Sequence, residues 1–201
     1  MQKKLIFIVV ICVSFFGFSQ NDWSLKKEAD NIKIYTRQPS NSSIKEYKAV
    51  TTIATNINYV LEELLEAPNY YEGCESNISY YVKELDDNKH VFYAHKDLPW
   101  PIKDRDVVTL LTVEPINKKT IKLTLESLPD EIPHKSKTIR IKKLMGHWLL
   151  EDMGGKTMVT QQLFLDPEGS LPPLIVNKLL IKGPYKTFKN LHNTIVGNKS
   201  F

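Results

Sequence analysis

The stretch "TIKLTLES", residues 120–127, is the most regular segment of the sequence. Ile121, Leu123 and Leu125 occupy alternate positions, and polar residues stand between them. Successive side chains of an extended chain point to opposite faces, so this period of two predicts a β-strand with one apolar and one polar face. Strands of this kind are typical of antiparallel sheets that bury one face.

Segments of similar character lie on both sides of this strand. Turn-forming stretches such as "DDNK" (86–89) and "MGGK" (153–156) separate them. With this strand taken as 120–128, the predicted strands also cover residues 32–37, 44–53, 79–85, 90–98, 105–114, 139–151 and 157–166. Consecutive strands joined by short turns predict a long, curved antiparallel sheet. The segment from Asp22 to Asn31 is expected to form a short helical turn before the first strand.

Helical segments are expected to cover the apolar face of this sheet. Asn56 is a typical N-cap, and apolar residues at helical spacing follow it until Pro68. Beyond Pro172, apolar residues recur every seven positions, at Leu174, Ile181, Phe188 and Ile195. Gly183–Pro184 should kink or break this C-terminal helix. The sequence therefore predicts an α+β fold in which the sheet wraps around the C-terminal α-helix, with an internal apolar cavity between them.

The first 20 residues have the pattern of a cleaved signal peptide. Lys3 and Lys4 precede an apolar run from Leu5 to Phe16, and small residues follow at Gly17 and Ser19. The run is short for a membrane span. We therefore expect an exported protein, periplasmic or secreted, whose residues 21–201 form a single domain and act as a monomer.

Charge and motif content exclude several function classes. The chain has 27 basic and 23 acidic side chains, and loss of Lys3 and Lys4 would leave a net charge of +2. That charge is too small for a protein whose main partner is a nucleic acid. Cys74 would be the one cysteine left after cleavage, so no internal disulfide is expected. The histidines lack metal-ligand spacing, and no glycine-rich phosphate loop or nucleophile motif occurs, so neither a metal nor a cofactor is expected.

Four segments in order give the chain a family likeness. They are "WSLKK…IKIYTR" within 23–37, "PWPIKDRDVV" at 99–108, "GHWLL" at 146–150 and "DPEGSLPPLIVN" at 166–177. With them the chain resembles the START domain, the lipid-transfer branch of the helix-grip (Bet v 1-like) superfamily, and most closely its bacterial exported members. The resemblance implies non-catalytic binding or transfer of a lipid or other hydrophobic ligand in a tunnel between sheet and C-terminal helix. It also implies that this helix and a neighbouring loop, here 129–137, move on release.

The segment "PWPIKDRDVV" is interpreted as a structural anchor in this setting. Arg105, between Asp104 and Asp106, is expected to fix the start of a strand through charge-assisted hydrogen bonds. Pro99 and Pro101 restrict the turn, and Trp100 is expected to plug the end of the sheet. The alternative interpretation is a catalytic loop.

Alternation along the strands and the C-terminal helical pattern predict the residues that face the cavity. These candidates are Tyr93, His95, Thr109, Leu111, Leu123, Leu125, Trp148, Gln161, Ile181 and Phe188. A bulge would reverse the assignment for a strand, because it exchanges the two faces. Sterol-binding relatives carry a buried acid–arginine pair where this sequence has His95 and Leu111, which argues against a sterol ligand.

Lysines of the C-terminal helix suggest a possible membrane contact. Lys178, Lys182, Lys186 and Lys189 form a stripe beside the apolar seam. Such a stripe can rest on anionic lipid headgroups, although an ordinary solvated face has the same pattern.

Two other function classes stay open at the level of sequence. The first is a cyclase- or hydrolase-type enzyme acting on a polyketide-like or aromatic substrate. Tyr93 and His95, two residues apart on one strand, are its candidate acid–base pair. The second is an interaction module with a filled core and no cavity.

Overall fold

The computed structural model describes residues 22–66, 78–169 and 171–197. The expected signal peptide, the helix stop at Pro68 and Cys74 lie outside these residues. Among the described residues, no helix is both long and apolar enough to cross a membrane.

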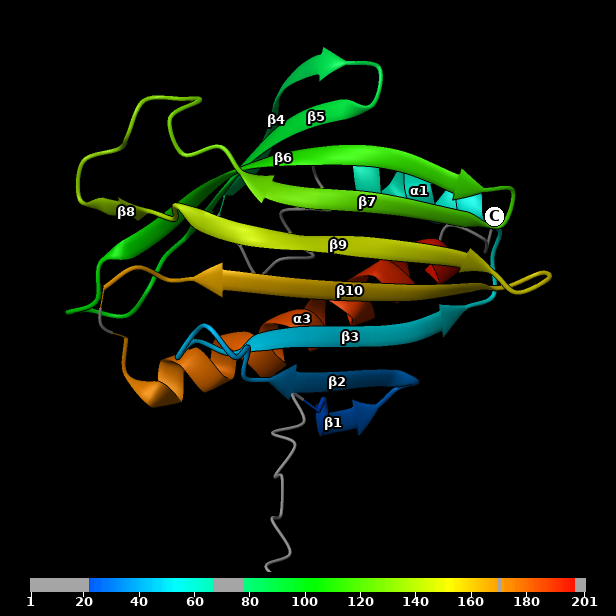
Figure 1. Cartoon of the computed structure of the whole chain (residues 1–201), viewed down its shortest axis with the longest axis horizontal. Helices are drawn as coiled ribbons and strands as arrows, with labels where there is room; N and C mark the ends of the chain where they lie inside the picture. The colour runs from blue at the N-terminus through cyan, green and yellow to red at the C-terminus, as the bar shows by residue number, and fades with distance from the viewer. Residues whose placement is uncertain (1–21, 67–77, 170, 198–201) are drawn as a thin grey trace, which may run out of the picture.

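A single ten-stranded sheet forms most of the structure (Figure 1). Its strands are β1 (Ser24–Ala29), β2 (Ile32–Arg37), β3 (Glu46–Ile53), β4 (Ile78–Asp86), β5 (Lys89–Lys96), β6 (Asp104–Asn117), β7 (Thr120–Ser127), β8 (Thr138–Arg140), β9 (Lys143–Asp152) and β10 (Thr157–Asp166). The order across the sheet is β1-β2-β3-β10-β9-β7-β6-β5-β4, all antiparallel. The short β8 pairs in parallel with the start of β6. β1 and β4 are therefore the two edges.

Two helices cover one face of the sheet, called the inner face here (Figure 1). Helix α1 (Ile57–Leu65) begins as expected at Asn56, whose side chain accepts a hydrogen bond of 2.9 Å from the Tyr59 N–H. Helix α3 (Pro173–Gly197) packs on β2, β3 and α1. It continues through Pro184 as one helix, so Gly183–Pro184 does not break it. This arrangement confirms the predicted helix-grip architecture.

Two of the predicted elements are wrong in kind or extent. The segment after Asp22 is strand β1 rather than a helical turn, because pairing with β2 satisfies its backbone, whereas so short a helix is marginal alone. The predicted strand 139–151 is split into β8 and β9. At the break, the Ser127 hydroxyl donates to the Lys142 carbonyl (2.7 Å) and accepts from the Leu144 N–H (3.2 Å).

Apolar side chains gather on both faces of the sheet. The main core lies between the inner face and the helices, where the rings of Trp148 and Phe188 stack with centroids 5.4 Å apart. A smaller outer cluster contains the buried Val91, Tyr93 and Val108. Because neighbours on β5 point to opposite faces, Phe92 belongs to the main core while its neighbours belong to the outer cluster.

Gly146 on β9 generates a stability prediction. A Cβ at this position would lie 2.2 Å from the Gln162 carbonyl oxygen and 2.8 Å from Leu163 Cδ1. Gly146→Ala should therefore lower the free energy of unfolding by about 1–3 kcal/mol, because the sheet backbone must move. Urea denaturation measures the change. In the control Gly183→Ala the new Cβ meets no atom within 4 Å, so that variant should be no less stable than wild type. Equal stability of Gly146→Ala and wild type would contradict the steric argument.

Candidate functional site

A pocket of about 240 Å³ lies between the sheet and the first half of α3. The end of β5, the start of β6, the second half of β10 and the connection from β10 to α3 contribute to its wall. Most of the lining is aliphatic. These side chains include Leu125, Leu144, Leu163, Leu165, Leu171, Val176, Leu179 and Leu180. Such a wall suits an apolar molecule, since few hydrogen-bonding groups interrupt it.

The helix wall of the pocket contains Gly183 and Pro184, and both residues are buried. Apart from its chain neighbours and the adjacent helix backbone, no atom lies within 4 Å of the position that a Gly183 Cβ would take, so the missing side chain leaves open space. Pro184 has no N–H, so the Leu180 carbonyl loses its usual helical donor. The Thr187 hydroxyl donates to the Gly183 carbonyl at 3.2 Å.

Two buried polar side chains of the sheet also line the pocket. Gln161 on β10 is 4% exposed, and its Oε1 accepts a hydrogen bond of 2.8 Å from the Tyr47 hydroxyl. Thr109 on β6 is 5% exposed. Among the described residues, neither Gln161 Nε2 nor the Thr109 hydroxyl has a hydrogen-bond partner. Both groups can therefore bond to a molecule in the pocket.

His95 lies in the pocket wall at the end of β5. Its Nε2 is 3.0 Å from Asp97 Oδ1 and 3.8 Å from Asp104 Oδ2. Its Nδ1 is buried and has no partner among the described residues. The three side chains bring one ligand atom each within 4.8 Å of one another, so they are the described residues best placed to hold a cation. The hydrogen bond between His95 Nε2 and Asp97 Oδ1 engages two of these atoms without one.

Arg105 ties the start of β6 to the segment that leads into α3. Its guanidinium donates to the carbonyls of Lys103, Pro167 (3.2 Å) and Glu168 (3.0 Å). Burial lowers the pKa of Arg105, and the nearby Asp104 carboxylate opposes that effect. Arg105 thus acts on the backbone of another segment rather than on its neighbouring aspartates.

The other residues of the 99–108 segment have separate roles. Asp104 Oδ1 accepts a hydrogen bond of 2.9 Å from the Leu98 N–H, which closes the turn. Trp100 is 92% exposed. The expectation that it plugs the sheet is therefore wrong, because the turn carries this side chain into solvent.

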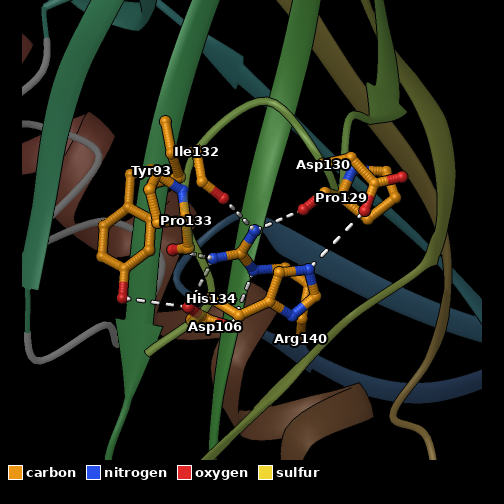
Figure 2. A network of polar contacts seen from close by, with 8 residues as sticks. All are labelled: Tyr93, Asp106, Pro129, Asp130, Ile132, Pro133, His134 and Arg140. Carbon is orange, nitrogen blue, oxygen red and sulfur yellow. Dashed lines mark hydrogen bonds and ion pairs between the residues drawn. The ribbon is translucent and has the colours of Figure 1, made fainter. Parts of the chain in front are cut away.

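Asp106 belongs to a buried network with Arg140 and Tyr93 (Figure 2). Arg140 Nε and Nη2 donate to the two carboxylate oxygens at 2.9 and 3.0 Å, and the Tyr93 hydroxyl donates to Oδ2 at 3.2 Å. Arg140 also donates to the carbonyls of Pro129, Ile132 (3.2 Å) and Pro133 (3.3 Å). Burial, and then the Asp106 charge, raise the pKa of the Tyr93 hydroxyl.

This network holds the loop 129–137 over the outer cluster. Lys135 Nζ lies 4.4 Å from the Tyr93 ring centroid, and Glu131 pairs with Lys83 on β4. None of the loop's residues lines the pocket. The structure therefore does not place this loop as a lid on the pocket.

The ten predicted cavity residues have four different positions, of which the last, that of Tyr93, is described separately below. His95, Thr109, Leu125 and Gln161 line the pocket. The residues buried in the main core beside it are Leu111, Leu123, Trp148 and Phe188, and the half-buried Ile181 is not part of the wall either. The sequence reasoning missed Leu163 and Leu165, although continuing the alternation from Gln161 along β10 would have found them.

Tyr93 does not face the pocket. β5 and β6 pair with Phe92 opposite Thr109, so Tyr93 lies on the other face of the sheet from Thr109. The predicted inward face of Tyr93 was therefore wrong, whereas His95 at the end of β5 does line the pocket. The structure consequently does not bring Tyr93 and His95 together in the pocket as an acid–base pair.

The lysines of α3 do not form a uniform free stripe. Lys182, Lys186 and Lys189 are exposed, but Lys189 Nζ is 3.0 Å from Asp30 Oδ2. The Tyr185 hydroxyl donates to the same oxygen at 2.5 Å. The side chain of Lys178 is not among those that the structure describes.

Arg140→Met tests the buried network. The change leaves Asp106 buried without its cation, so it should lower the free energy of unfolding by about 3–5 kcal/mol. It should also make the loop 129–137 more sensitive to a protease, since three carbonyls lose their donor. Urea denaturation and limited proteolysis measure these effects. Lys189→Met removes an exposed ion pair and should cost less than about 1 kcal/mol. A similar small cost for Arg140→Met would contradict the assigned role.

Comparison with known proteins identifies the family. The START domain model matches residues 16–199. An uncharacterized protein of Pseudomonas aeruginosa is 30% identical over 200 residues, which are 96% of this chain and 98% of that protein. The phosphatidylcholine transfer protein of Rattus norvegicus is 24% identical over 78% of this chain and 75% of its own. The crystal structure of a STAR-related lipid transfer protein from Xanthomonas axonopodis, fragment 25–204, superposes with a TM-score of 0.78 and 27% identity, covering 87% of this chain and 98% of that fragment. The chain belongs to the START domain family.

Proposed function

We propose that this chain is a non-catalytic carrier that binds a lipid or other hydrophobic ligand between the sheet and α3. The observation that carries the proposal is the aliphatic pocket, walled by leucines of β10 and by the buried Gly183–Pro184 of α3. START relatives whose names record lipid transfer give it further support.

Desolvation supplies the binding energy in this proposal. A ligand gains about 25 cal/mol for each Å² of apolar surface that it removes from water. Entry requires the first half of α3 to separate from the sheet, because that half forms one wall. Arg105 holds the segment before α3 at Pro167 and Glu168, so this segment is the natural hinge.

No arrangement in the described residues favours an enzyme. Of the candidate acid–base pair, His95 lines the pocket and Tyr93 does not, and the Tyr93 hydroxyl is bonded to Asp106. The proposal is therefore a carrier rather than a cyclase or hydrolase.

Export of the carrier as a monomer is part of the proposal. The charged and apolar pattern of residues 1–20 supports cleavage and export. N-terminal sequencing of the protein from the periplasm or medium of its host should begin after Ser19 or Gln20. A protein that stays in the cytoplasm with residues 1–20 attached would contradict the proposed export.

Native mass spectrometry of the protein purified from its host tests the binding function. The wild type should carry an apolar molecule that organic extraction releases. Gly183→Leu should lower the bound fraction at least about tenfold, because the leucine fills space that the ligand needs. It should not destabilise the helix, since leucine favours helix more than glycine does.

Lys182→Leu is the matched control, because it places a leucine at an exposed position of the same turn. This variant should keep its ligand. An empty wild type that also fails to bind Nile red would overturn the proposed function.

A further inference from the structure

The buried charges of the pocket wall are already engaged within the protein. Among the described lining residues, Arg105 and Asp106 are the buried charged side chains. Arg105 donates through Nε, Nη1 and Nη2 to three carbonyls, and both Asp106 oxygens accept from Arg140. A charged ligand group would have to break these bonds to gain a partner, which is costly in a buried site.

Besides His95 Nδ1, the described lining groups without a partner belong to two uncharged side chains. Gln161 Nε2 and the Thr109 hydroxyl lie on buried side chains that line the pocket. The Gln161 oxygen is taken by Tyr47, so this amide offers its donor side to the pocket. Thr109 offers a hydroxyl, which can donate or accept. An unpaired buried polar group costs free energy, so a ligand that satisfies these atoms gains affinity.

The opposite wall contains a carbonyl without its usual helical donor. Pro184 lacks the N–H that would bond to the Leu180 carbonyl, and both residues line the pocket. Donors on the sheet wall and an acceptor on the helix wall match a hydroxyl, which needs one of each.

We propose that the pocket selects an uncharged lipid whose polar group is a hydroxyl, carbonyl or amide, in preference to a phosphorylated or ionised lipid. Gln161 and Thr109 bind this group from the sheet, and the Leu180 carbonyl binds it from the helix. The aliphatic wall takes the hydrocarbon. This selectivity rests on the proposed function, since it assumes that the pocket is the ligand site.

Displacement of Nile red by three compounds with one chain length tests the selectivity. Hexadecanol, hexadecane and hexadecyl phosphate differ only in the end group. Hexadecanol should displace the dye at a concentration about tenfold below that needed for each of the others. Equal or tighter binding of hexadecyl phosphate would overturn the selectivity, as would equal binding of hexadecane. If the protein binds the dye but shows one of these two results, only the selectivity is overturned and the proposed carrier function is not. Failure of the protein to bind the dye or any compound would overturn both.

Variants assign the recognition to the named side chains. Thr109→Val and Gln161→Leu should each weaken hexadecanol binding about threefold to tenfold, the equivalent of one hydrogen bond. Hexadecane binding should not change in either variant. A general loss of structure would weaken the binding of hexadecane as well. Thr112→Val, on the same strand but outside the pocket wall, should bind hexadecanol as wild type does. Gln161→Leu removes the acceptor of the Tyr47 hydroxyl and could therefore fail to fold. In that case Thr109→Val alone tests whether the named side chains bind the hydroxyl. Parallel losses for hexadecanol and hexadecane would contradict the assignment.

Discussion

The packing of α3 on the inner face of the sheet is the contact on which both core and pocket depend. Toward the C-terminal end of the helix, Phe188 stacks on Trp148, and Leu191 and Ile195 are buried with it. Toward the N-terminal end, Leu179, Leu180 and the buried glycine–proline pair face the pocket instead. One helix thus serves two purposes, because its second half fixes the position from which its first half forms a wall.

Two buried arginines hold irregular segments by the same chemistry. Arg105 binds carbonyls of the segment before α3, and Arg140 binds carbonyls of the loop 129–137. They differ in charge balance, since Arg140 has Asp106 as a bidentate partner and Arg105 has carbonyl partners. The loop is therefore held by an ion pair within a low-dielectric site, whereas the segment before α3 is held by weaker dipoles. That difference agrees with the proposal that α3 separates from the sheet while the loop stays in place.

Local periodicity was sufficient to predict most of the fold. The alternation in 120–127 and 157–166 gave the strands and the faces of Leu125 and Gln161 correctly. Seven-residue spacing identified Phe188 and Ile195 as helix residues that pack inward, but it did not indicate Leu179 and Leu180. Those residues line the pocket together with residues of β6 and β10, and no local pattern of the helix records this contact between distant segments.

Contacts between distant segments were beyond the same reasoning. The face of Tyr93 depends on the register between β5 and β6, and a slip of one residue reverses it. The pairing of Asp106 with Arg140 joins positions 34 residues apart. The residues next to Asp106 in the sequence give no indication of this partner. The sequence nevertheless contained one usable signal, an aspartate at the start of an apolar strand, which indicated a buried charge in need of a partner.

The edges of the sheet have a consequence for behaviour at high concentration. β1 has a register shift between Leu25 and Lys27, and β4 has two, between Tyr81 and Lys83 and between Glu84 and Asp86. Each edge strand also carries charged side chains, which resist the approach of a second strand. Irregular, charged edges are poor templates for the addition of a strand from another chain. The exposed apolar side chains Ile78 and Leu85 lie on such an edge, where a second chain cannot easily pair with β4. A carrier of the proposed kind, which opens to exchange its ligand, would thereby resist joining its neighbours into aggregates.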